Sequence, residues 1–180
     1  MTIQPKLIGL CGKKGVGKST YASFLAGKTG HVFSFATPLK SMLCAVFPNE
    51  YVLKKKDEKL PYFECTARYL LQTLGTEWGR EIVDKNIWIK LLRVRLIEHL
   101  TDTALTPLVV DDLRFDNEAE MLRELGGEIW HLDRRSFTAS NDNHVSEQGV
   151  SDNLITKKVL LWTTPLKKVT GQKMCLSMPK

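Results

Sequence analysis

Cysteine is scarce in this sequence, and its spacing builds no recognisable site. The four cysteines, Cys11, Cys44, Cys65 and Cys175, are scattered and form no C-x-x-C pair. A disulfide framework or a cysteine metal site would need patterned spacing, so we expect reduced thiols in a cytoplasmic protein. The four histidines also lack the spacing of metal ligands. The sequence therefore gives no sign of a zinc site or a redox site.

Long apolar runs are missing too. The run Leu7–Cys11 is far shorter than the roughly 20 apolar residues that span a bilayer. The residues before it lack the charged stretch followed by a long apolar segment that marks a signal sequence. We therefore expect no membrane partner.

Aromatic residues are sparse where positive charge collects. The net charge is +6, and much of it lies in residues 157–180, where lysines face few acids. The stretch does not alternate lysines with aromatic residues, as a platform for stacking bases would require. We interpret it as a solvated basic surface and expect no nucleic-acid partner.

The composition that remains is that of one globular domain. The chain has 180 residues, of which 43% are apolar and 26% charged. This length buries a substantial core, and the balance of residue types is ordinary. We expect a single domain over residues 1–180.

Apolar runs alternate with segments of helical character along the chain. This alternation predicts an α/β fold with three layers, α/β/α, around a parallel sheet. The predicted strands are Ile3–Cys11, His31–Phe35, Pro107–Val110, Glu128–Leu132 and Lys158–Trp162. The predicted helices are Ser19–Gly27, Thr37–Phe47, Glu64–Leu74, a stretch from Trp78, Asn86–Leu100 and Asn117–Leu125.

Two segments stand apart from this alternation. Residues from about 48 to 100 form a helical insertion, which begins with a lysine-rich, exposed excursion over Pro48–Pro61 and ends in a strongly amphipathic helix. Residues from about 134 to 152 are rich in polar and small side chains and are predicted to form a lid-like loop.

The strongest motif follows the first predicted strand. Residues 12–19, GKKGVGKS, fit the phosphate-loop pattern G-x-x-x-x-G-K-[ST]. Glycines let successive backbone N–H groups face phosphate oxygens, and the following helix adds its positive N-terminus. We therefore expect ATP with Mg²⁺, Lys18 on the β- and γ-phosphates and the Ser19 hydroxyl on the metal. The predicted nucleotide-binding residues are Gly12, Lys13, Lys14, Gly15, Val16, Gly17, Lys18, Ser19 and Thr20.

Four segments together resemble one family. They are the phosphate loop, Arg68–Arg80, Val110–Glu118 and His144–Glu147. The chain resembles the phage-type deoxynucleoside monophosphate kinases, which have an adenylate-kinase-like phosphate-loop fold. The resemblance implies the reaction ATP + dNMP → ADP + dNDP in deoxynucleotide biosynthesis, and the host cytoplasm as its location for a phage-encoded enzyme.

The segment Arg68–Arg80 is a candidate site for the acceptor nucleotide. Arg68 and Gln72 lie four residues apart, on one helical face. An arginine can hold a monophosphate through two charge-assisted hydrogen bonds, and a glutamine can both donate to and accept from a base edge. The resemblance, with Arg80 added, implies an acceptor site lined by Arg68, Gln72, Gly75, Thr76, Arg80, Trp88 and Asp112. The competing interpretation places Trp88 in the core and Gln72 and Thr76 on the plain surface of an amphipathic helix. It places Arg68 and Arg80 in surface ion pairs.

Further charged residues complete the predicted site. Asp111 and Asp112 follow a buried strand beside the phosphate loop, where we expect Asp111 to hold the metal and Asp112 to contact the acceptor. Arg114 either reaches phosphate or pairs with Glu118. The remaining positive charge for phosphoryl transfer is predicted to come from the lid, and the catalytic residues are then Lys18, Arg68, Arg114, Arg134 and Arg135.

Other functions share the phosphate loop and remain open at this point. One is a kinase of another small metabolite, such as dephospho-coenzyme A, although the segment from Gln72 to Thr76 does not support it. Another is a nucleic-acid-coupled ATPase or a non-catalytic nucleotide-binding module. The sequence does not decide the accepted base, or between a monomer and a homodimer, and it assigns no chemistry to His144–Glu147.

Overall fold

The computed structural model describes residues 6–101, 106–134 and 149–161. Within them, five strands form one sheet in the order β2-β3-β1-β4-β5, and every neighbouring pair is parallel. All five predicted strands are confirmed, with small shifts at their ends. They are β1 (Leu7–Cys11), β2 (His31–Phe33), β3 (Leu108–Val110), β4 (Glu128–Arg134) and β5 (Lys157–Leu161).

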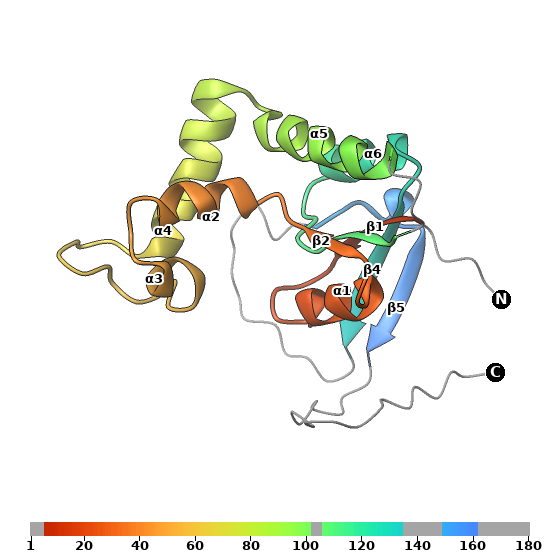
Figure 1. The fold of residues 1–180 in the computed structure, drawn as a ribbon, viewed down its shortest axis with the longest axis horizontal. Helices are drawn as coiled ribbons and strands as arrows, with labels where there is room; N and C mark the ends of the chain where they lie inside the picture. The colour runs from red at the N-terminus through yellow and green to blue at the C-terminus, as the bar shows by residue number, and fades with distance from the viewer. Residues whose placement is uncertain (1–5, 102–105, 135–148, 162–180) are drawn as a thin grey trace.

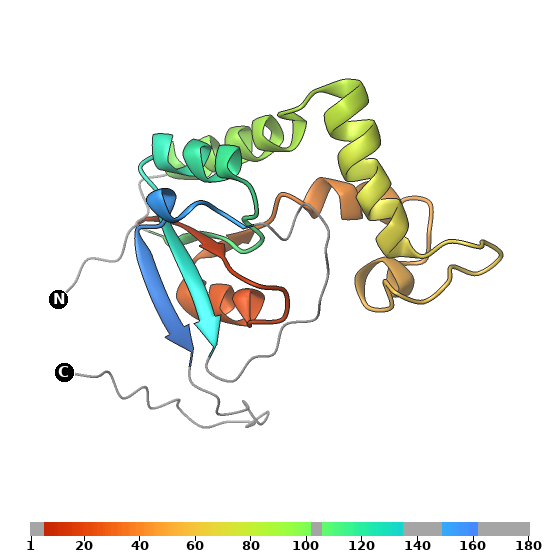
Figure 2. The same cartoon turned by 180° about the vertical axis from the view of Figure 1, so that it is seen from behind.

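Helices cover both faces of the sheet (Figures 1 and 2), as the predicted three-layer fold requires. Helix α1 (Lys18–Ala26) lies on one face, and α5 (Ile87–Thr101) and α6 (Asp116–Glu124) lie on the other. Successive side chains of β1 point to opposite faces of the sheet. Accordingly, Ile8 and Leu10 belong to the core on the α1 side, and Leu7 to the core on the α5 and α6 side.

The predicted insertion projects from one side of the sheet (Figure 1). It contains α3 (Asn49–Leu53) and α4 (Ala67–Thr73), the latter with Thr66 accepting the Tyr69 N–H as its cap, and α2 (Thr37–Cys44) leads into it. The prediction that Pro48–Pro61 is simply exposed was wrong. The segment contains α3, and its Val52 and Leu60 are buried in a small core that they share with Leu43 and Ala67.

The predicted break at Gly75–Thr76 was also wrong. Helix α4 continues without interruption into η1 (Leu74–Val83), a π-helix. Glycine weakens an isolated helix, but here it serves packing. A Cβ atom on Gly75 would lie 3.3 Å from Leu39 Cδ1, so the absence of a side chain lets α2 approach closely.

Helix α5 is less amphipathic than its sequence suggested. Its inner face buries Leu92 and Leu96, as its apolar spacing predicted, together with Trp88. Its outer face, however, also carries exposed apolar residues, among them Leu91 and Val94. No helix in the described ranges is both long and apolar enough to cross a membrane. Beyond α6, the short 3-10 helix η3 (Asp152–Leu154) leads into β5.

Candidate active site

The phosphate loop joins the central strand β1 to α1. Gly12 has φ 128° and Gly17, the N-cap of α1, has φ 109°, a backbone conformation that glycine adopts readily. A Cβ atom on Gly12 would overlap the carbonyl oxygen of Leu132 in β4. The loop can therefore keep this path beside β4 only with glycine at position 12. Its glycines are thus required by the geometry that exposes backbone N–H groups to a phosphate.

Lys18 lies folded over this loop. Its ammonium group donates to the carbonyl oxygens of Gly12, at 2.6 Å, and of Lys13, at 3.0 Å. These bonds hold the Lys18 ammonium group against the phosphate loop, the position that the sequence predicted. Next to the loop, burial raises the pKa of the Cys11 thiol to about 11, so that group stays protonated and unreactive.

The two predicted metal ligands come together in the structure. The Ser19 hydroxyl lies near enough to the Asp111 carboxylate to lower its pKa as a hydrogen-bond donor. Burial raises the pKa of Asp111, and nearby Asp112 adds to this, whereas the Ser19 bond and the positive charges of Lys40 and Lys18 lower it. The described residues contain no group of three or more histidine, cysteine or acidic side chains that could hold a metal ion. A hydroxyl and one carboxylate fit Mg²⁺, which commonly takes its other ligands from water and substrate phosphates.

Asp112 is bound by its own chain. Its Oδ1 accepts the Phe35 N–H at 2.8 Å, and its Oδ2 accepts the Ser34 hydroxyl at 2.6 Å and the Ala36 N–H at 3.0 Å. These bonds fix the turn from which α2 and the insertion begin. The geometry therefore supports a positioning role, and the predicted contact between Asp112 and the acceptor stays a prediction.

Arg68 points its guanidinium at a carboxylate near the phosphate loop. Its Nε and Nη2 both donate to Asp57, the second over 2.9 Å to Oδ2. The bond from Arg68 lowers the pKa of Asp57 most, and the charges of Lys14 and Lys56 lower it further. Since Lys14 belongs to the phosphate loop, the insertion presents Arg68 to the same region as the predicted ATP phosphates.

Two lysines in this region were missed from the sequence. Lys56 is half-buried, and burial, Lys40 and Arg68 lower its pKa, while Asp57 and Asp111 oppose the shift. Lys40 and Lys56 thus extend the positive region around Arg68 and Asp111. Lys40 could have been suspected, because it follows a strand and lies on the first turns of a predicted helix. Lys56 was hidden within a charge run that is typical of surfaces.

Arg80 pairs with Glu118 instead of facing an open site. Its Nη2 donates to Glu118 Oε1 at 3.1 Å, and its guanidinium lies 4.5 Å above the Phe115 ring. Glu118 Oε2 accepts the backbone N–H groups of Arg114, at 2.9 Å, and Phe115, at 3.2 Å. The contact between Arg114 and Glu118 is thus made by the main chain of Arg114. Its predicted role on phosphate stays a prediction.

Trp88 packs in the core, as the competing interpretation held. It is only 3% exposed, and its indole N–H donates to the Gly75 carbonyl at 2.8 Å. A Cβ atom on Gly79 would overlap its ring. Trp88 and Gly75 thus have packing roles, with the glycine facing Leu39, and their predicted contacts with the acceptor stay predictions.

The remaining acceptor residues lie along the continuous helix α4–η1. Gln72 is exposed and Thr76 half-buried. In an α-helix, residues four apart drift by about 40° around the axis. In a π-helix, whose turn holds more than four residues, the drift runs the other way. The switch at Leu74 therefore keeps Arg68, Gln72, Thr76 and Arg80 close to one row.

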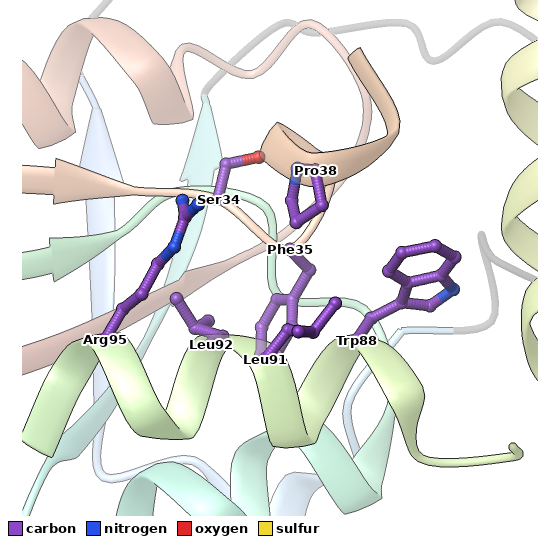
Figure 3. A pocket seen from close by; sticks show the side chains of 7 residues that line it. All are labelled: Ser34, Phe35, Pro38, Trp88, Leu91, Leu92 and Arg95. Carbon is purple, nitrogen blue, oxygen red and sulfur yellow. The ribbon is translucent and has the colours of Figure 1, made fainter. Parts of the chain in front are cut away.

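A hollow lies where the insertion joins the sheet (Figure 3). It is small and open to solvent, with a cavity volume of about 10 Å³. In Figure 3, the Arg95 side chain extends from α5 toward Ser34. The lining of the hollow comes from the segment that follows β2 and from α5. It comprises Ser34, Phe35, Pro38, Trp88, Leu91, Leu92 and Arg95. Trp88 is the one predicted acceptor residue in this lining.

The predicted lid begins at Arg134, the last residue of β4. The Nε of Arg134 is buried and has no hydrogen-bond partner within the described residues, which is unusual for a buried donor. Arg135, most of the predicted lid and His144–Glu147 lie outside those residues. At the far end, the Ser151 N–H and hydroxyl both donate to Asp116, at 2.8 and 2.6 Å, and tie the chain to α6.

Comparison with known proteins gives a consistent result. Residues 49–158 match the family model described as deoxynucleotide monophosphate kinase. A protein of Acanthamoeba polyphaga mimivirus that carries this name is 36% identical over 155 residues, which cover 78% of this chain and 80% of the relative.

Two phage proteins are also similar. The deoxynucleoside-5'-monophosphate kinase of Escherichia phage T5 is 32% identical over 124 residues, or 63% of this chain and 46% of the relative. The deoxynucleotide monophosphate kinase of Escherichia phage RB69 is 32% identical over 85 residues, or 47% of this chain and 34% of the relative. The match thus spans less than half of either phage protein. The matched family region begins after the phosphate loop, so the loop is a separate observation.

Proposed function

The chain belongs to the deoxynucleotide monophosphate kinase family, and from this premise we propose that it catalyses ATP + dNMP → ADP + dNDP at the carboxyl edge of its sheet. The observation that carries the proposal is the convergence of Lys14, Lys18, Ser19, Asp111 and Arg68 there. The family argues against the dephospho-coenzyme A kinase and against the nucleic-acid-coupled ATPase or non-catalytic module.

The donor half of the site is the phosphate loop. A nucleotide kinase uses ATP, and residues 12–20 offer its phosphates backbone N–H groups, the Lys18 ammonium and the N-terminus of α1. Ser19 and Asp111 would hold Mg²⁺, because the hydroxyl and the carboxylate lie near each other beside the phosphate loop. When bound, the metal neutralises negative charge on the phosphates. Lys18 would leave the carbonyl oxygens of the loop to bind phosphate.

The acceptor half is formed by the insertion. Arg68 would hold the phosphate of the acceptor, with Lys40 and Lys56 adding positive charge nearby. Gln72 and Thr76, farther along the row, would contact the nucleoside. An oxygen of the acceptor phosphate attacks the γ-phosphorus of ATP, and the bond from that phosphorus to the β–γ bridging oxygen breaks. No general base is required, since this oxygen is already ionised near neutral pH.

Charge in the transition state would be offset by arginines as well as by Lys18. Arg134 fits this role because its buried Nε lacks a partner within the described residues and it ends the strand beside the phosphate loop. Arg114 follows Asp111 on the same edge and stays a proposed phosphate ligand, as does Arg135.

The organisation of the protein is proposed on the same basis. A single domain carries the insertion of residues 48–100 and a lid near residues 134–152. Small nucleotides are its substrates, and the host cytoplasm is the proposed location, as for a phage enzyme.

We propose a homodimer because Leu91, Val94 and Ile97 leave an apolar strip exposed on α5. Light scattering on the wild type and on Val94→Glu would measure it, and an unchanged mass would refute this contact.

The acceptor assignment is tested with two alanine variants in an assay of ADP release. Arg68→Ala should raise the KM of every deoxynucleoside monophosphate by a similar factor, about 10-fold or more, because all share the phosphate. Gln72→Ala should instead change the ranking of the bases. Equal and uniform effects would show that Gln72 does not touch the base. ADP release that does not depend on a monophosphate would contradict the kinase reaction itself.

A further inference from the structure

Asp57 is bound to the Arg68 guanidinium, the group to which the proposed function assigns the acceptor phosphate. Its carboxylate receives two hydrogen bonds from Arg68, one from Nε and one from Nη2. The backbone also joins the two segments, since the Arg68 N–H donates to the Lys56 carbonyl at 2.9 Å. The segment that carries Asp57 is therefore held against the first turn of α4, with the carboxylate on the guanidinium.

A carboxylate is a close chemical match for a phosphate at this position. Arginine binds both groups in the same way, through two parallel N–H donors to two oxygens. The surroundings suit an anion as well, because the charges of Lys14 and Lys56 reach Asp57 and lower its pKa together with the bond from Arg68. Asp57 thus sits within the positive region that would receive the acceptor.

The ion pair between Asp57 and Arg68 is one that a phosphate can replace. The Asp57 side chain is 73% exposed and that of Arg68 is 37% exposed. Ion pairs at such sites are weak, because water and salt screen them and two long side chains must be ordered. A phosphate carries more charge than a carboxylate and would bind the same donors more strongly. Displacement of Asp57 would therefore cost little.

We propose that Asp57 is a positioning residue that holds the place of the acceptor phosphate on Arg68 until a nucleotide displaces it. The inference rests on the proposed role of Arg68. The carboxylate balances the surrounding positive charge while no acceptor is bound. It also competes with every acceptor, and with free phosphate, for the same two donors.

The test is Asp57→Asn, which keeps the shape and removes the charge. The KM of every deoxynucleoside monophosphate should fall by about two- to five-fold, the range expected when a weak competing ion pair is removed. The kcat and the KM of ATP should stay unchanged. Inorganic phosphate, assayed as a competitor of the acceptor, should inhibit the variant at concentrations lower by a similar factor.

Glu64→Gln is a matched control. Glu64 also pairs with a basic residue, Lys59, and lies exposed in the same part of the insertion. Its charge is removed in the same way, but its partner takes no part in the proposed site. All kinetic constants should therefore stay at the wild-type values. A fall in acceptor KM equal to that of Asp57→Asn would attribute the effect to general charge and overturn the proposal.

The double variant Arg68→Ala/Asp57→Asn separates this inference from the proposed function. If Asp57 acts through Arg68, its replacement should have no effect on acceptor KM once Arg68 is absent. A rise in KM from Arg68→Ala without a fall from Asp57→Asn would overturn this inference alone. An unchanged KM in Arg68→Ala would overturn the acceptor assignment and this inference with it. A loss of kcat in Asp57→Asn at unchanged KM would also contradict the place-holding role.

Discussion

Glu118→Gln should change how the stability of the protein depends on pH. Glu118 is only 2% exposed, and it accepts hydrogen bonds from Arg80 and from the backbone of Arg114 and Phe115. Despite these donors, burial raises its pKa from 4.5 to about 7, and the negative charge of Asp112 adds to the shift. The desolvation penalty of the charged Glu118 carboxylate is thus larger than the stabilisation that its hydrogen-bond donors provide.

The direction of the effect follows from the two pKa values. Because the folded protein binds this proton more tightly than the unfolded chain, the stabilisation is complete below pH 4.5 and is lost as the pH rises through about 7. The shift from 4.5 to about 7 corresponds to about 3 kcal/mol in the free energy of unfolding. Glutamine does not ionise, so the variant lacks this loss.

Urea unfolding at several pH values, followed by tryptophan fluorescence, measures the effect. The difference in unfolding free energy, wild type minus variant, should fall by about 3 kcal/mol between pH 4.5 and pH 8, or by about 1 to 2 M in the urea midpoint. A part of this difference that is the same at every pH would report the hydrogen bonds with Arg80 and the backbone that the variant has lost. Other carboxylates cancel in the difference. Parallel curves for the two proteins would refute the reasoning, because Glu118 would then titrate alike in both states.

Two further substitutions test the donor site and the core. Lys18→Ala should leave the urea midpoint nearly unchanged but lower kcat by about 10²- to 10³-fold, since it removes one phosphate-binding cation. A variant with a tenth of wild-type turnover would contradict the role of the loop. Trp88→Phe should cost about 1 to 2 kcal/mol in unfolding free energy, through the lost bond to Gly75 and lost volume, while the acceptor KM stays within about two-fold. A large rise in that KM at unchanged stability would instead place Trp88 in the acceptor site.

The sheet could be predicted because its signals are local. Each strand is a short apolar run, and β1 is followed directly by glycines whose positive φ angles the loop requires. The order of chain elements and the presence of a phosphate loop follow from such runs alone. The meeting of Ser19 and Asp111 also followed, because both come after parallel strands whose carboxyl ends share one edge.

The insertion could not be predicted in the same way, because its contacts join distant residues. Glycine usually ends a helix, yet Gly75 is retained inside one by its packing against Leu39. Arg80 pairs with Glu118, which lies 38 positions away in the sequence, and no local pattern indicates this pairing. Lys56 and Asp57 looked like part of a surface charge run, and their contacts with Arg68 depend on how the segment folds back onto α4.

The strand order has a consequence for how the protein is made. Among the five described strands, the central one leaves the ribosome first, and its residues Leu7 and Leu10 pair with Leu108 and Trp130. At about 5 to 20 residues per second, β1 waits roughly 5 to 20 s for its neighbours. The residues of the small core from Leu43 to Ala67 are all synthesised during that interval, and their contacts are local in the sequence, which favours early formation. Until β3 and β4 are synthesised, the apolar strand that leads to the phosphate loop has both edges unpaired, which makes this interval the stage at which the nascent chain is most open to aggregation.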